Sequence, residues 1–167
     1  MPKLLKYFLY VLAGVAVILI VFKTFNDSVS NNSANAFEWE KEVNIYLSNS
    51  KMGSNDDCTK VFPVARKIIN AETFGPGALE ALLKGPTFEE VADGYSTTIN
   101  DNILVQRFEI LEKVAHVDFD SRFSEGMGGS CRVQAIRSQI EATLNALPDI
   151  DSVVISVNGE TEGILEP

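Results

Sequence analysis

The chain has 167 residues, of which 46% are hydrophobic, and this length suits one folded domain with an appendage. The charge is distributed unevenly, because residues 24–167 hold 11 basic and 23 acidic side chains, a formal charge of −12. A domain of this charge is repelled by nucleic-acid phosphates at long range. We therefore expect no nucleic-acid partner.

The N-terminus contains a predicted membrane anchor. From residue 4 to residue 22 the sequence LLKYFLYVLAGVAVILIVF is apolar apart from Lys6, and about 20 such residues cross the hydrocarbon core of a bilayer. A lysine near the end of a span can extend its charged group to the interface. Lys3 and Lys6 precede the apolar run, so the positive-inside rule places the N-terminus in the cytoplasm and the rest of the chain outside. We predict an uncleaved single-pass anchor over residues 1–25.

Cleavage of this segment as a signal peptide is the alternative. The best small-x-small site is Ala34-Asn35-Ala36, which lies 12 residues beyond Phe22, farther than ordinary processing sites. Residues 26–37 are rich in Asn and Ser, a composition typical of flexible linkers. The sequence thus favours an anchor followed by a linker, with cleavage left open.

The folded domain is predicted to span residues 38–167. Runs that alternate apolar and polar residues predict strands, and apolar residues at spacings of three and four predict helices. Pro76 begins the first predicted helix, Gly85-Pro86 ends it, and Pro148 ends the second. In chain order we predict strands at 43–47 and 60–66, a helix at 75–84, strands at 103–110 and 113–120, a helix at 130–147 and a strand at 152–157.

The order β-β-α-β-β-α-β indicates an α/β fold. Elements in this order bury their apolar faces when helices pack on a sheet. We predict a two-layer sandwich, in which one mixed β-sheet carries two helices on one face, together with the N-terminal transmembrane helix.

Several segments occur in the order found in one known family. They are VFPVAR at 61–66, ALEALLKGPTFEE at 78–90, VAHVDFDSRF at 114–123, the helix at 140–144 followed by Leu147-Pro148, and SVVISVNGE at 152–160. Over about residues 42–162 the chain resembles the GerMN domain, first described in sporulation and spore-germination proteins. No single motif carries the resemblance, which rests on order and spacing.

The resemblance implies an extracytoplasmic, membrane-attached α/β domain. GerMN proteins work in envelope complexes, and the family has no attributed catalytic residues. It implies that this chain, with one domain copy behind its anchor, binds a partner and holds no catalytic residue, cofactor or metal ligand of its own.

His116, Asp118 and Asp120 are the residues in the chain that most resemble a reactive site. Residues i, i+2 and i+4 of a strand share one face, so these three side chains could bind a divalent metal or act in acid/base chemistry. The same spacing is also that of a strand with one face in the core and one in water. Because the chain has no second histidine, we favour the structural interpretation and keep the metal site as the alternative.

Cys58 and Cys131 are the two cysteines of the chain. Two cysteines in a domain outside the membrane are expected to form a disulfide with each other. Two separate thiols are the alternative, and the start of a helix would make Cys131 reactive in that case. We predict the disulfide.

Two further features have weaker signals. Ser54-Asn55-Asp56-Asp57 resembles part of a calcium loop but lacks the spacing of an EF-hand, so we interpret it as a solvated acidic turn. Trp39 and Tyr95 are candidate partner anchors, although Trp39, near the first strand, can equally cap the core.

The functional prediction is a membrane-anchored extracytoplasmic module that binds an envelope protein or peptidoglycan without catalysis. The alternative is an envelope metal-dependent hydrolase that uses His116, Asp118 and Asp120. A carrier of a small ligand would need a deep apolar pocket, which sequence does not reveal.

Overall fold

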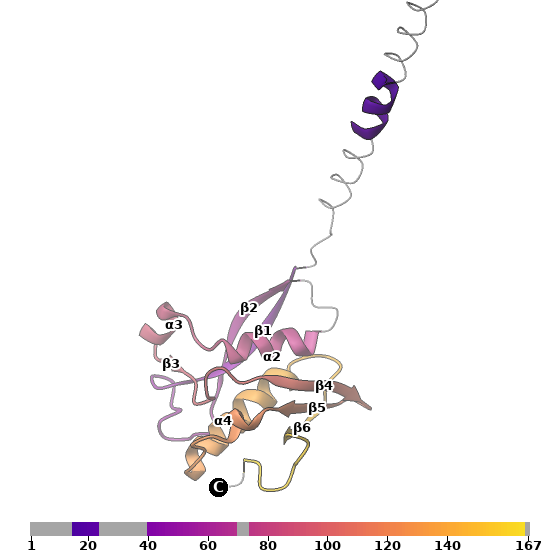
Figure 1. Cartoon of the computed structure of the whole chain (residues 1–167). Coiled ribbons are helices and arrows are strands. Elements are labelled where there is room, and N and C mark those ends of the chain that lie inside the picture. Colours follow the sequence, from indigo (N-terminus) through magenta and orange to yellow (C-terminus); the bar gives the residue numbers. More distant parts are fainter. Residues whose placement is uncertain (1–14, 24–39, 70–73, 166–167) are drawn as a thin grey trace, which may run out of the picture. The chain divides into compact units, whose positions relative to one another are not determined.

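A computed structural model describes residues 15–23, 40–69 and 74–165 (Figure 1). The chain divides into two compact units, Met1–Glu38 and Trp39–Pro167. In the first unit, residues 15–23 form a helix with exposed side chains. None of the helices in the described ranges combines the length and the hydropathy that a membrane span requires. Most of the predicted anchor and the whole predicted linker lie outside the described residues, so both remain predictions.

The second unit contains six strands and three α-helices in its described part. In chain order they are β1 (Glu40–Asn49), β2 (Phe62–Ile69), α2 (Phe74–Leu83), α3 (Phe88–Ala92), β3 (Tyr95–Ser96), β4 (Val105–Leu111), β5 (Val114–Phe119), the 3₁₀ helix η1 (Ser121–Ser124), α4 (Ser130–Asn145) and β6 (Ser152–Val157). The predicted order of five strands and two helices is confirmed. The short elements α3, β3 and η1 were not predicted.

The strands form two small sheets, and the prediction of one sheet is wrong. The first sheet has the order β2-β1-β3 and is antiparallel, whereas the second has the order β4-β5-β6 and is mixed, because β5 and β6 run parallel. The backbone of β1 shows one reason for the division. The Tyr46 N–H donates a hydrogen bond to the Thr143 hydroxyl oxygen of α4 at 2.9 Å. A helix side chain therefore occupies a position where a neighbouring strand would pair.

Together the two long helices contact both sheets instead of covering one face of a single sheet (Figure 1). Helix α2 packs against β1, β2 and α4, while α4 packs against β1 and β6. Side chains from both sheets and both helices form a single core, and the largest fully buried apolar members are Ile45, Leu47, Leu79, Leu82, Val117, Phe119, Phe123, Ile136, Ile140 and Leu144. Complete burial of one such side chain stabilises the fold by about 1.5–3 kcal/mol.

Helix α4 buries the apolar stripe that the sequence predicted. Val133, Ile136, Ile140 and Leu144 are all at most 3% exposed. The buried face also contains Gln139, whose side-chain amide has no hydrogen-bond partner within the described protein. The 3.6-residue periodicity does not distinguish this polar side chain from its apolar neighbours.

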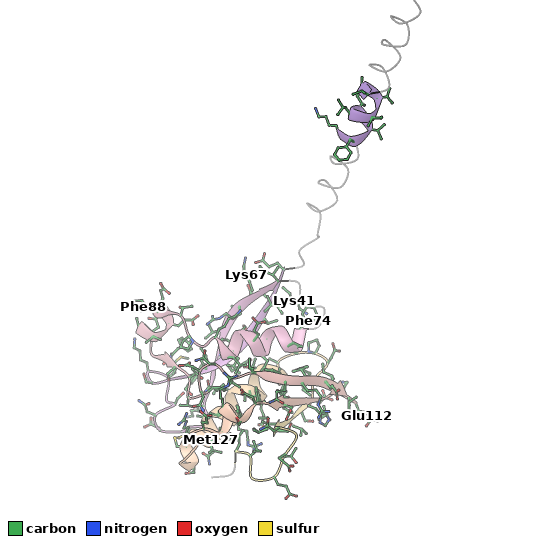
Figure 2. All side chains as sticks on the ribbon, in the orientation of Figure 1. Lys41, Lys67, Phe74, Phe88, Glu112 and Met127 are labelled. Atoms are coloured by element: carbon green, nitrogen blue, oxygen red, sulfur yellow. A yellow bond between two sulfur atoms is a disulfide. The ribbon has the colours of Figure 1, made fainter. Side chains whose placement is uncertain are left out.

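A two-residue turn joins β4 to β5. Glu112 and Lys113 have φ angles of 50° and 66°, and Leu111 pairs with Val114 on either side of them. Two consecutive positive φ angles define the type I′ turn, whose twist matches that of a hairpin. Glu112 therefore lies at the tip of the hairpin (Figure 2).

Candidate functional site

The structure places His116 and Asp118 on the outer face of β5, as their spacing predicted. Ala115, Val117 and Phe119 lie on the opposite face and are at most 1% exposed. His116 is half-buried between Glu109 of β4 and Val154 of β6.

Asp118 is not a solvent-facing residue, contrary to the prediction. It is 8% exposed and accepts hydrogen bonds at Oδ1 from the Ser156 hydroxyl at 2.6 Å and the Gly159 N–H at 2.8 Å. The Ser156 hydroxyl, followed by the Gly159 N–H, holds the pKa of Asp118 below its usual value. The carboxylate therefore fixes β6 and the turn after it to β5.

Asp120 lies beyond the end of β5 and has different partners. Its carboxylate accepts hydrogen bonds from the Leu104 N–H at 3.1 Å and from the Arg122 guanidinium. Within the described ranges, no three His, Cys, Asp or Glu side chains are close enough together to hold a metal ion. Asp118 and Asp120, two members of the alternative metal site, thus make separate local contacts.

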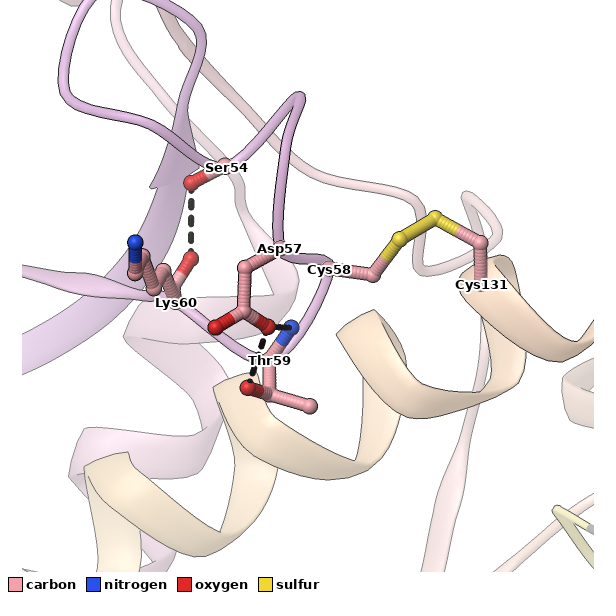
Figure 3. The surroundings of a disulfide bond; sticks show 6 residues. All are labelled: Ser54, Asp57, Cys58, Thr59, Lys60 and Cys131. Atoms are coloured by element: carbon pink, nitrogen blue, oxygen red, sulfur yellow. Dashed lines mark hydrogen bonds between the residues drawn. A yellow bond between two sulfur atoms is a disulfide. The ribbon is translucent and has the colours of Figure 1, made fainter.

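Cys58 and Cys131 form a disulfide in the structure (Figure 3). Cys58 lies in the loop between β1 and β2, and Cys131 is the second residue of α4, with 5.3 Å between the Cα atoms. The bond joins segments separated by 73 residues. It therefore ties the loop of the first sheet to the start of the long helix.

The loop around Cys58 is held by its own polar side chains (Figure 3). Asp57 Oδ1 accepts hydrogen bonds from the Thr59 N–H at 3.0 Å and the Thr59 hydroxyl at 2.6 Å. The Ser54 hydroxyl donates to the Lys60 carbonyl at 2.7 Å. These contacts support the interpretation of residues 54–57 as an acidic turn.

A groove of about 520 Å³ lies between α2 and the first half of β4. Its lining consists of Pro76, Leu79, Glu80, Leu83, Lys84 and residues 102–108. Leu104 is 59% exposed and Val105 is 37% exposed, so the groove presents apolar surface to solvent. We call it the α2/β4 groove.

The α2/β4 groove follows a free strand edge. Among the described strands β4 pairs only with β5, so one backbone edge of β4 has no strand partner. Every residue from 102 to 108 lines the groove. Strand β4 begins at Val105, and its residues 105–108 all line the groove, so the groove lies beside the first part of this edge. Other domains bind peptides by adding a strand to such an edge.

Helix α3 presents a second apolar surface. Phe88 is 86% exposed, and Val91, three residues later on the same side of the helix, is 55% exposed (Figure 2). Helix α3 buries none of its residues. Exposed aromatic side chains of this kind are frequent anchors in protein interfaces.

Polar contacts hold α3 in place although it contributes nothing to the core. Thr87 and Glu90 form a capping box. The Arg66 guanidinium donates two hydrogen bonds of 2.6 Å to the Glu90 carboxylate, and this pairing lowers the pKa of Glu90. The Lys51 ammonium donates to the Ala92 carbonyl at 2.8 Å. Phe88 therefore projects from a helix that polar contacts hold in a fixed position.

Sequence reasoning missed Phe88 and proposed other aromatic anchors. Tyr95 is half-buried and packs against the core, and Trp39 lies outside the described residues. The sequence Thr87-Phe88-Glu89-Glu90 matches the capping-box pattern, and this signal could have revealed α3. The α2/β4 groove joins segments that are distant in sequence, so no local pattern indicates it.

Residues 44–163 match the family described as "Germane: Sporulation and spore germination". No curated protein matches the chain.

Two solved structures from Bacillus subtilis resemble the fold. The tandem GerMN domains of the sporulation protein GerM are 21% identical, with a TM-score of 0.54 over 74% of this chain and 41% of that one. The first GerMN domain of GerM is also 21% identical, with a TM-score of 0.50 over 72% of this chain and 85% of that one. This chain thus spans about two fifths of the tandem protein. Because the family match covers most of its length, the chain belongs to the GerMN (Germane) family and contains one copy of the domain over residues 44–163.

Proposed function

We propose that the chain is a membrane-anchored, extracytoplasmic module of the bacterial cell envelope that binds another protein and has no catalytic activity. The observation that carries the proposal is the α2/β4 groove, in which apolar side chains line an unpaired strand edge. Contiguous exposed apolar surface marks interaction sites in soluble domains. Phe88 on α3 supplies a second exposed apolar surface.

Two features support the compartment. The Cys58–Cys131 disulfide is of the kind that persists in oxidising environments outside the cytoplasm. The apolar residues 4–22 with their preceding lysines favour a single-pass anchor with a cytoplasmic N-terminus. In this arrangement the GerMN domain lies outside the membrane.

The surfaces of the domain favour a protein partner over peptidoglycan and over a substrate. An apolar groove complements side chains better than it complements a polar sugar polymer. The hydrolase alternative would need His116, Asp118 and Asp120 to converge, but Asp118 bonds to Ser156 and Gly159 while Asp120 bonds to Leu104 and Arg122.

Capture from the native envelope tests the proposal. The full chain is crosslinked in intact cells and purified by an affinity tag, and the co-purified proteins are quantified by mass spectrometry. Leu104→Asp places a charge in the groove, and Leu111→Asp is the matched control because Leu111 is 56% exposed but lies outside the groove. Losing one buried leucine contact lowers affinity by about 10-fold or more.

We expect an envelope protein that is captured by the wild type and by Leu111→Asp, and that is reduced at least about 10-fold with Leu104→Asp. Equal capture by Leu104→Asp and the wild type would show that the partner does not bind in the groove. Enrichment of peptidoglycan alone, or of no envelope component, would contradict protein binding. Labelling of Leu111→Cys by a membrane-impermeant maleimide in intact cells checks the compartment.

A further inference from the structure

We infer that the α2/β4 groove takes an extended peptide segment that adds a strand to β4, with apolar side chains at alternate positions and an acidic side chain near Lys84. The inference rests on the proposed function and names the chemistry of the partner. The occupant is thus an extended segment of the partner and not a helix or a folded surface.

The backbone of β4 favours an extended occupant. The groove lies beside the unpaired edge of β4 at residues 105–108, and an unpaired edge presents N–H and C=O groups that a further strand can pair with. An extended chain satisfies such groups by main-chain hydrogen bonds, whereas a helix has already used its own main-chain groups. The strand edge therefore sets the conformation of the partner.

Helix α2 favours apolar side chains on one side of that segment. Leu79 and Leu83 of α2 line the groove opposite Ile103 and Leu104. Side chains of an added strand point alternately to its two faces, so only every second side chain would face these leucines. The partner therefore carries apolar residues with a period of two.

The charges that line the groove favour an acidic group on the partner. The charged lining residues are Glu80, Lys84 and Arg107, a net charge of +1, whereas residues 24–167 carry −12. Glu80 and Lys84 form an exposed ion pair at 2.9 Å, which contributes little on its own and can be exchanged. A carboxylate beside Lys84 would meet the local positive charge.

Selection from a displayed library of random ten-residue peptides identifies such a segment. The target is the full chain in lipid nanodiscs, and peptides that also bind Leu104→Asp are removed. We expect the enriched peptides to alternate apolar residues and to carry an acid. With the target variant Lys84→Glu/Arg107→Glu, the selected acid should be replaced by a basic residue, because the rim then carries the opposite charge.

An N-methyl scan of the best peptide tests strand addition itself. Methylation removes one backbone N–H at a time, and only alternate residues of an edge strand direct that group to the neighbouring strand. We expect a loss of about 10-fold at every second position and little change between them. Ile69→Asp should leave the affinity unchanged, because Ile69 is 58% exposed on β2 and lies outside the groove.

Several results would overturn the inference. The first is that no peptide in the library prefers the wild type to Leu104→Asp. The second is that the losses in the N-methyl scan do not recur at every second position. The third is that the enriched peptides bind as helices. If an envelope protein is nevertheless captured in a Leu104-dependent manner, the proposed function stands and only the extended conformation fails. If peptides bind but no envelope protein is captured, the proposed function fails instead.

Discussion

Gly75 in α2 is constrained by a residue of another element. An added Cβ at position 75 would lie 2.4 Å from Cζ and 2.7 Å from Cε1 of the Phe108 ring. Phe108 belongs to β4, so this close approach positions the strand against the helix and forms one end of the α2/β4 groove. The glycine thus serves packing between the two walls of the site.

Gly75→Ala should therefore destabilise the protein. Overpacking of this kind costs about 1–3 kcal/mol, and it opposes the usual gain from replacing glycine in a helix. The free energy of unfolding is measured by chemical denaturation. In a Phe108→Leu background the same substitution should be neutral or stabilising, and an equal loss in both backgrounds would refute the packing account.

Asp118 should make stability depend on pH. Its pKa is lowered in the folded protein, so its contribution is fully present above the unfolded value of about 3.9 and is lost as pH falls through the folded pKa. Asp118→Asn should lower the free energy of unfolding by about 1 kcal/mol at pH 7, because charge-assisted hydrogen bonds become neutral ones.

The difference between wild type and Asp118→Asn should close as pH falls below about 4. Asp149→Asn is the control, since Asp149 is exposed. Denaturation curves across pH 2–7 make the comparison. A difference that is constant with pH would exclude the carboxylate as the cause.

Single residues show where sequence reasoning succeeds. The period of two placed His116 and Asp118 on one face and Ala115 and Val117 on the other, because the strand geometry alone decides that question. The pattern could not show that Asp118 is buried, since Ser156 and Gly159 come from a distant segment. Contacts between segments, not local preference, give each polar side chain its role.

At the scale of elements, the β4–β5 hairpin contains a turn that its residues do not favour. Type I′ turns prefer Asn-Gly because both central residues need positive φ angles, yet this turn is Glu112-Lys113. Residues other than glycine are strained in this region. The turn was predicted near residues 111–112, but its type was not, because the sequence lacks the usual residues.

Replacing the turn by Glu112→Asn/Lys113→Gly should raise the free energy of unfolding by about 1 kcal/mol. The exposed ion pair between Lys113 and Asp151 is lost, but its 3.6 Å geometry on the surface makes its contribution small. Lys113→Val should have the opposite effect, since β-branched residues tolerate positive φ poorly. The midpoints of thermal unfolding should rank the double variant above the wild type and the wild type above Lys113→Val. A different order would contradict the turn assignment.

The longer elements were predicted, whereas the short ones were not. The apolar periodicity of α4 and the alternation in β5 are maintained over whole elements. Helix α3 has five residues and no buried side chain, so it has no apolar periodicity to detect. The division into two sheets accompanies contacts between distant segments, such as that between Tyr46 and Thr143, which no strand pattern indicates.

At the scale of the whole molecule, the disulfide joins the first sheet to the long helix. Removing it by Cys58→Ser/Cys131→Ser should lower the free energy of unfolding by about 4 kcal/mol, because a closed loop of this length restricts the unfolded chain. Denaturation of the wild type with reductant should approach that of the variant. Alkylation without reduction should modify neither cysteine, and two modified thiols would show that the bond is absent from the isolated protein.

The whole molecule combines a stable core with apolar surfaces that the core does not use. Leu104 in the α2/β4 groove and Phe88 on α3 are exposed, while the Asp118 carboxylate on the outer sheet face bonds within the domain. Composition and charge led us to expect no nucleic-acid partner but could not locate these surfaces. Binding through the groove is therefore the central claim.

Photo-crosslinking from position 104 tests this claim most directly. A photoreactive amino acid replaces Leu104 in the full chain, and the cells are irradiated with the native membrane intact. We predict a covalent adduct with an envelope protein from position 104 and none from the control position 111, which is similarly exposed. Equal crosslinking from both positions, or none from position 104, would contradict the account.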